Sequence, residues 1–223
     1  MGAPLDRRAV LKGLAAAAAA LTAGGVTTGA LAGGAGAAPA AVDPVTAQTL
    51  EAFADTIIPG ERRYAGDRAV AGAVSGPGAV QAGALDVLAS PELPLRPLLP
   101  GIAALLTTRA TAYAATHLIV LPPLLPPFVG LSFAHRTALV GRLYGPEDAD
   151  RAIWQVLALV VSLAFDTAAN HDTAEAVRTG HPGLTWLGFP AAGADGVWRF
   201  DAYSYGRSLA PLHPSTTPSG SPA

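Results

Sequence analysis

The chain has 223 residues, of which 51% are hydrophobic and 13% charged, and its formal net charge is −2. It has no cysteine, which excludes disulfides, zinc sites with thiolate ligands, iron–sulfur clusters and covalently attached haem. Binding to nucleic acid needs clustered basic side chains, which this mildly acidic chain lacks, so we expect no nucleic-acid partner.

The first 37 residues have the three parts of a twin-arginine export signal. Paired arginines come first, an alanine-rich apolar stretch follows at 13–23, and Ala35 and Ala37 form a small-x-small cleavage site. The residues of the export motif are Arg7, Arg8, Leu11 and Lys12. Residues 1–37 are therefore predicted to be a signal peptide that engages the twin-arginine translocase, with the mature protein exported to the cell envelope or secreted.

Two alternatives for this segment stay open, namely an ordinary secretory signal and an alanine-rich helix that remains on the protein. The glycines between residues 24 and 34 disfavour a permanent helix, because each weakens it by about 1 kcal/mol. The paired arginines favour the twin-arginine route over a general secretory signal.

Residues 38–213 are predicted to form one helical domain. Its first helix begins at Asp43-Pro44, an N-cap oxygen followed by proline at the first helical position. Apolar residues then recur every three or four positions until Pro59-Gly60 ends the helix. The polar, glycine-rich residues 60–78 are predicted to be a loop, and a short helix is predicted at 79–88.

Prolines prevent regular structure between residues 91 and 100, and a longer helix is predicted from 101 to 118. Residues 121–127 contain two proline pairs and are predicted to be a stiff connector. A further helix is predicted at 132–144, with a serine N-cap and a glycine after its end.

Residues 152–165 are apolar on all sides and are predicted to form a buried central helix. The segment is too short to cross a membrane, which needs about 20 apolar residues, so no stable membrane anchor is expected after cleavage. The expected fold class is therefore all-α, a single bundle of about five helices around this central helix.

An irregular, aromatic-rich arm is predicted from about residue 180, and residues 214–223 are predicted to be a disordered tail. Trp and Tyr combine a large apolar area with a polar tip, which suits them to partner surfaces. The aromatics of the arm are predicted either to pack back over the helices or to dock a partner. The candidate contact residues in the arm are Trp186, Trp198 and Tyr205.

Arg109 is a further candidate contact, because the predicted 101–118 helix places this cation on its apolar stripe. Three placements stay open: the side chain reaches the rim, pairs with an acid such as Asp166, or faces a partner protein.

Motifs for cofactor binding and catalysis are absent from the sequence, including Gly-x-Gly-x-x-Gly, Gly-x-Ser-x-Gly and His-Glu-x-x-His. We therefore expect no catalytic residue, cofactor or metal on this chain. His171 and Asp172, next to Asn170, form the one group that resembles a general base with an orienting acid. Polar side chains at a helix end more often serve as caps, so a secreted enzyme using this group stays as a minor alternative.

Two segments in order resemble the gluconate 2-dehydrogenase subunit 3 family, whose members also typically begin with a twin-arginine leader. The first ends a helix with the sequence ADTIIP, and the second is a proline-glycine-alanine turn followed by Ala-Gly at the next helix. The matching residues are Asp55, Ile57, Ile58, Pro59, Pro77, Gly78 and Gly83. The resemblance covers the leader and residues 45–90, and is only generic beyond Leu93.

The resemblance implies an exported, all-helical, non-catalytic accessory subunit or export escort. Its partner would be the large subunit of a flavin-dependent oxidoreductase of the glucose–methanol–choline type, and FAD would be bound in that partner. The alternative is a secreted cell-envelope protein with a binding or structural role and no enzymatic activity.

Overall fold

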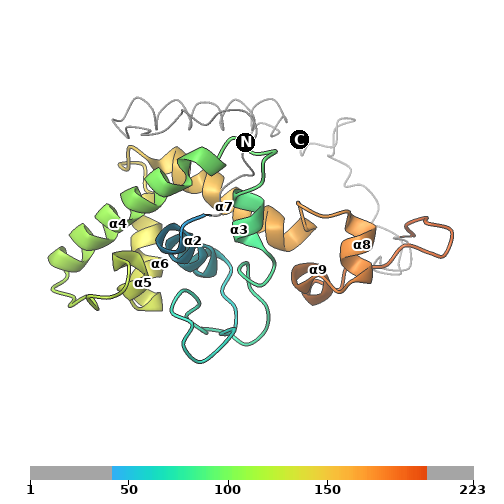
Figure 1. The fold of residues 1–223 in the computed structure, drawn as a ribbon, viewed down its shortest axis with the longest axis horizontal. Coiled ribbons are helices and arrows are strands. Elements are labelled where there is room, and N and C mark those ends of the chain that lie inside the picture. The colour runs from blue at the N-terminus through green and yellow to red at the C-terminus, as the bar shows by residue number, and fades with distance from the viewer. Residues whose placement is uncertain (1–41, 200–223) are drawn as a thin grey trace, which may run out of the picture. The chain divides into compact units, whose positions relative to one another are not determined.

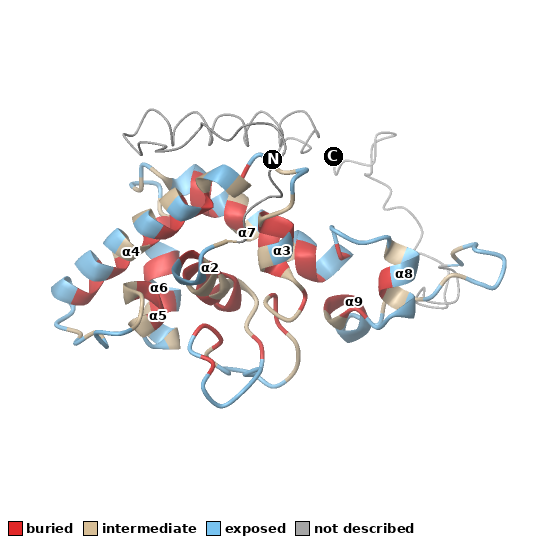
Figure 2. Cartoon of the chain, in the orientation of Figure 1, coloured by how far each residue is buried: buried red, intermediate tan, exposed pale blue. Residues whose placement is uncertain are grey.

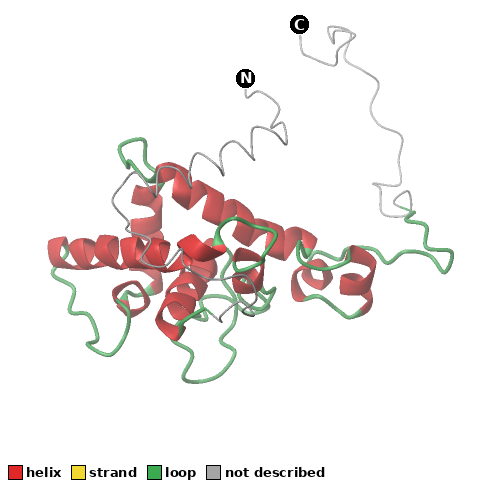
Figure 3. Ribbon diagram, turned by 45° about the horizontal axis from the view of Figure 1, so that its top comes forward, coloured by secondary structure: helices red, strands yellow, loops and turns green. Residues whose placement is uncertain are grey.

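The computed structural model describes residues 42–199 of the chain. Within this range the chain forms eight α-helices and one 3-10 helix, with no strand (Figure 3), which confirms the predicted all-α class. The helices are α2 (Pro44–Ile57), α3 (Ala84–Leu88), η1 (Arg96–Leu98), α4 (Leu99–Thr116), α5 (Pro127–Gly130), α6 (Phe133–Leu143), α7 (Arg151–Thr167), α8 (Thr173–Arg178) and α9 (Pro182–Trp186). The signal peptide, Tyr205 and the predicted tail at 214–223 lie outside the described residues.

The starts of several helices follow from side-chain caps. At α2, Oδ1 of Asp43 accepts hydrogen bonds from the N–H groups of Val45 and Thr46 at 3.1 and 3.0 Å, with Pro44 in the first turn. Ser132 caps α6 and Asp172 caps α8 in the same way. These caps satisfy N–H groups that have no partner inside a helix, so local sequence fixes where the helices begin.

The main core surrounds α2, which contacts α3, α4, α5, α6 and α7. Figure 1 shows α2 in the middle, with α4, α5 and α6 on one side and α3 on the other. Trp154 of α7 and Phe53 of α2 are fully buried, with ring centroids 6.2 Å apart. The Phe53–Trp154 contact joins α2 to α7. Aliphatic side chains complete this core, among them Leu50, Ile102 and Leu106.

The predicted 152–165 helix lies within α7 and buries one face of the helix rather than all of it. Trp154 and Leu157 are fully buried, whereas Leu159 and Leu163 are 41% and 38% exposed. Figure 2 shows both buried (red) and exposed (pale blue) stretches along α7. Other helices therefore cover only part of the apolar side chains in this segment, and the rest face solvent. Among residues 42–199 no helix is both long and apolar enough to span a membrane.

Three short helices, α5, α8 and α9, were not predicted from the sequence. The last two enclose a small second cluster of Ala168, Ala176 and Leu184, against which Phe189 packs. His181 caps α9, since its Nδ1 accepts from the N–H of Leu184 at 3.4 Å while its Nε2 lies 3.3 Å from the carbonyl of Ala82. Burial lowers the pKa of His181, which favours the neutral ring that this capping arrangement requires.

The chain divides into two compact units, with the boundary between Phe189 and Pro190. Only residues 190–199 of the second unit are described, and they form a turn in which Gly193 N–H donates to the carbonyl of Val197. Asp195 accepts from the N–H of Val197 and forms an ion pair with Arg199 across this turn.

Candidate docking surface

The segment 118–126, here called the apolar connector, joins α4 to α5 and presents the most exposed large apolar side chains of residues 42–199. Leu118, Val120 and Leu124 are 90%, 93% and 94% exposed, whereas no other large apolar residue in that range exceeds 62%. Ile119, Leu121 and Leu125 instead pack against the main core. Alternating exposure at 118–121 is the pattern of an extended segment with one face held by the core and the other free.

Leu118 takes a left-handed backbone conformation, with a φ of 54°. It follows the end of α4, where its N–H bonds to the carbonyl of Ala115 at 3.3 Å and the N–H of Ile119 bonds to the carbonyl of Ala114 at 2.9 Å. This pair of bonds defines a Schellman motif, in which glycine normally occupies the left-handed position. A leucine there costs about 1–2 kcal/mol, and the side chain gains almost no burial in return.

Prolines and a buried anchor hold the rest of the connector. The N–H of Leu125 donates to the carbonyl of Pro122 at 3.3 Å, closing a turn that places Leu124 at its tip. The turn rests on α5, because a Cβ built on Gly130 would lie 3.0 Å from Cδ of Pro122. Phe128 in α5 is fully buried, so α5 is anchored in the core next to the turn that exposes Leu124.

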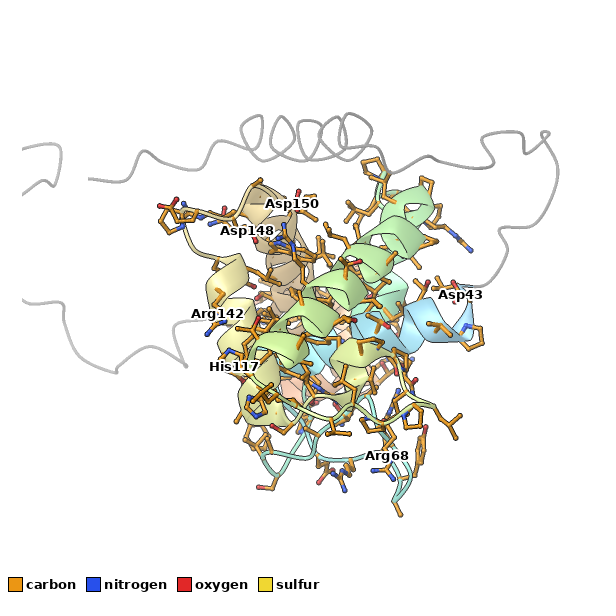
Figure 4. The ribbon with its side chains drawn as sticks, turned by 90° about the vertical axis from the view of Figure 1, so that its left-hand side faces the viewer. Asp43, Arg68, His117, Arg142, Asp148 and Asp150 are labelled. Atoms are coloured by element: carbon orange, nitrogen blue, oxygen red, sulfur yellow. The ribbon has the colours of Figure 1, made fainter. Side chains whose placement is uncertain are left out.

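Arg136 of α6 ties α5 to the 60–78 loop. The side chain is only 3% exposed, and its guanidinium donates to the carbonyls of Ala69, Arg68 and Val129 at 2.7, 2.9 and 2.6 Å and to that of Leu131. Burial lowers the pKa of Arg136, although nearby carboxylates oppose that shift. One buried cation therefore links the loop to α5, which directly follows the connector. Figure 4 labels Arg68, whose side chain is exposed.

Cationic and aromatic side chains lie next to the start of the connector, around Tyr113. Cζ of Arg142 lies 5.0 Å from the centroid of the Tyr113 ring, and the His117 ring stacks on it at 4.2 Å. The Tyr113 hydroxyl is 3.3 Å from Nδ1 of His135. Figure 4 shows Arg142 and His117 along one edge, and His117 directly precedes the exposed Leu118 in the chain.

Arg109 makes an internal ion pair, but not with Asp166, the acid named as an example from the sequence. Nη2 of Arg109 lies 2.7 Å from a carboxylate oxygen of Asp150 and 3.6 Å from one of Asp148, two acids in the turn before α7. Asp166 lies near the other end of α7. Arg109 therefore joins α4 to the start of α7, where Figure 4 labels its two acidic partners.

The aromatic residues predicted to contact a partner differ in their surroundings. Trp186, in α9, is 61% exposed, yet its ring lies against the backbone of Gly76, where an added Cβ would be 2.6 Å from Cζ3. Trp198 is half-buried in the second unit. The chain's own loop thus covers part of the Trp186 ring.

The residues that carry the family resemblance meet at one junction. Asp55 is 1% exposed, and its two carboxylate oxygens accept from the N–H groups of Gly60 and Ala71 at 3.2 and 2.9 Å. Burial raises the pKa of Asp55, against the effect of these hydrogen bonds and of Arg136. The carboxylate closes both ends of the 60–71 loop, which is a structural role.

Pro59-Gly60 and Pro77-Gly78 bring two backbones into direct contact. A Cβ on Gly78 would lie 2.5 Å from the nitrogen of Gly60 and 2.6 Å from the carbonyl oxygen of Ile58. Gln81 fastens the junction by accepting from Gly78 N–H and donating to the carbonyl of Glu61. Gly83 then starts α3 with a φ of 77°, and Ile57 and Ile58 pack against the core.

His171 and Asp172 lie in the turn between α7 and α8. Asp172 accepts from the N–H of Glu175 at 3.0 Å and is the N-cap of α8. The exposed His171 ring lies 5.9 Å from the ring of His181. Asp172 is therefore engaged as a cap, and residues 42–199 contain no group of three or more His, Cys, Asp or Glu side chains placed to hold a metal ion.

Together these features describe residues 42–199 as all-helical, with an exposed, proline-rich apolar connector. The chain belongs to a sequence family described as Family of unknown function (DUF5987), which matches residues 44–223. No curated protein and no solved structure matches it. The resemblance to gluconate 2-dehydrogenase subunit 3 stays a prediction.

Proposed function

We propose that this chain is an exported, non-catalytic accessory subunit that binds another protein through the apolar connector. The observation that carries this proposal is the exposure of Leu118, Val120 and Leu124 on a segment held by prolines and by the core. Single exposed apolar residues are common on soluble proteins, but three in one short segment at 90–94% exposure offer apolar area that a partner would cover.

The rigidity of the connector supports binding, because little conformational freedom is lost when a partner covers it. The strained backbone at Leu118 supports the same use. Strain persists at positions with a function, and an exposed leucine in a left-handed conformation contributes nothing evident to the stability of the free chain. The Arg142 cation and the paired rings of Tyr113 and His117 add polar groups near the start of the connector, as in interfaces with an apolar centre and a polar rim.

The class of partner comes from the resemblance of residues 45–90 to the subunit 3 family. This resemblance implies that the partner is the large subunit of a flavoprotein oxidoreductase that holds FAD. It also implies that this chain is exported by the twin-arginine route before or together with that enzyme. These two elements stand on sequence patterns alone.

The test is co-purification of the tagged chain from the exported fraction of its native host, with bound flavin measured by fluorescence. The test variant combines Leu118→Asn, Val120→Ser and Leu124→Ser. The matched control combines Val45→Ser and Val74→Ser, two exposed aliphatic residues outside the connector. We expect flavin with the wild type and the control, and none with the connector variant, whose melting temperature is expected not to fall.

Three results would count against parts of this proposal. Equal flavin with the connector variant means that another surface binds the partner. A specific partner without flavin contradicts the flavoprotein assignment and keeps the docking role. Retention on cell-envelope material without any protein partner supports the binding or structural alternative.

A further inference from the structure

A hollow of about 650 Å³ lies between α2, α6 and α7, and none of its lining residues belongs to the apolar connector. Its apolar lining includes Ile57 of α2, Val140 of α6 and Ala158 of α7. Sites for small molecules occupy about 300–1,000 Å³ and are lined mainly by apolar side chains with a few polar groups. The volume and the lining of this hollow fall within that description, and the hollow is largely open to solvent.

Gly141 lies in α6 on the wall of the hollow, and the fold gives no steric reason for a glycine there. A Cβ added to it would meet no atom within 4 Å, and the residue is exposed. Glycine inside a helix costs about 1 kcal/mol relative to alanine. The missing side chain leaves space on the wall that nothing in residues 42–199 fills.

Polar groups line the same hollow. Arg151 is its one charged lining residue, and its guanidinium makes no ion pair or hydrogen bond within residues 42–199. Gln155, one turn further along α7, is exposed with its amide equally unengaged in that range. The Tyr144 hydroxyl is buried and has no hydrogen-bond partner in the described part of the chain, and burial raises its pKa to about 12, which keeps it a donor at neutral pH.

From these features we infer that the hollow binds a small molecule with an apolar body and a carboxylate head. The carboxylate pairs with Arg151, the apolar body lies over Ile57 and Val140, and the space beside Gly141 admits it. The assignment stands apart from the docking role of the connector, because the two surfaces share no residue.

The probe is octanoate, compared with octan-1-ol and octylamine, in calorimetric titration and thermal shift on the mature chain. We expect octanoate to bind and to raise the melting temperature, octan-1-ol to bind about tenfold more weakly, and octylamine not to bind. One charge-assisted hydrogen bond accounts for a tenfold preference.

Two variants test where the probe binds. Gly141→Leu adds a large side chain to a residue that lines the hollow, at a position where a Cβ meets no atom within 4 Å. It is therefore expected to abolish octanoate binding while the melting temperature of the free protein stays the same or rises. Arg151→Gln is expected to weaken octanoate binding about tenfold and to leave octan-1-ol binding unchanged. Gly141→Ala, which adds only a methyl group, is the matched control for the first variant.

No octanoate binding to the wild type at millimolar concentration would overturn the inference. Full binding by Gly141→Leu would place the probe elsewhere with the same consequence. Equal affinity for octanoate and octylamine would overturn the carboxylate assignment. A chain that is dimeric in sedimentation and becomes monomeric with Gly141→Leu would assign the hollow to a second copy instead.

Discussion

Replacing Leu118 by asparagine is expected to make the free protein more stable and to impair partner binding. The Leu118 side chain is 90% exposed, so removing it loses only a small part of the roughly 1.5–3 kcal/mol that a fully buried leucine contributes. The left-handed backbone costs leucine about 1–2 kcal/mol, whereas asparagine adopts it readily. The Schellman hydrogen bonds are made by backbone atoms and are kept.

The net expectation is a gain of about 1 kcal/mol, or about 2–4 °C in melting temperature for a domain of this size. Leu118→Ala is the matched control, because it removes the apolar side chain but keeps the Cβ that makes the conformation costly. Calorimetry should show a gain with asparagine and none with alanine, and both variants should lose partner binding. A lower melting temperature with Leu118→Asn would refute the reasoning, since it would mean that the leucine stabilises the free fold.

Three further predictions address export, packing and pH. Replacing Arg7 and Arg8 together by lysine should leave uncleaved protein in the cytoplasm because the planar guanidinium pair is lost, and normal export in a strain without the twin-arginine translocase would contradict this. Gly78→Ala should lower the free energy of unfolding by about 1–3 kcal/mol, because its Cβ would lie 2.5 Å from Gly60 N, whereas Gly141→Ala should not lower it; urea denaturation measures both. Burial alone would raise the pKa of Asp67, but hydrogen bonds from Arg63 and from a backbone N–H outweigh burial and lower that pKa. The stability that this carboxylate contributes is therefore present above its unfolded pKa and is lost as the pH falls through its folded pKa. Arg63→Gln should therefore lower the melting temperature at neutral pH, with a difference from wild type that shrinks below about pH 4, and a constant difference across that range would contradict the assignment.

The helices that the sequence predicts well are those whose ends carry a local signal. Asp43-Pro44 and Ser132 predict the starts of α2 and α6, because a capping oxygen acts within three residues of its own position. The short helices α8 and α9 lack an apolar stripe long enough to detect, and their stability depends on contacts such as that of Phe189 with the second cluster.

The candidate surface could be predicted only in part. Two proline pairs predict a segment without regular structure, which the structure shows at 121–126, whereas Pro127 already begins α5. Which of its apolar residues face solvent depends on how α5 anchors the segment. The sequence predicts a helix end at Leu118 but not the left-handed turn there, because such a turn is normally marked by glycine and position 118 is a leucine. The partners of Arg109 were missed because Asp148 and Asp150 lie far from it in the sequence and come close to it only in the folded chain.

The most direct test of the docking role is site-specific photocrosslinking in the exported fraction of the native host. A photoreactive phenylalanine derivative replaces Leu124 at the tip of the connector, and Val45 in the first turn of α2 as the control position. The docking role predicts a single crosslinked product of defined mass from position 124 and none from position 45. No product from position 124, or the same products from both positions, would contradict it.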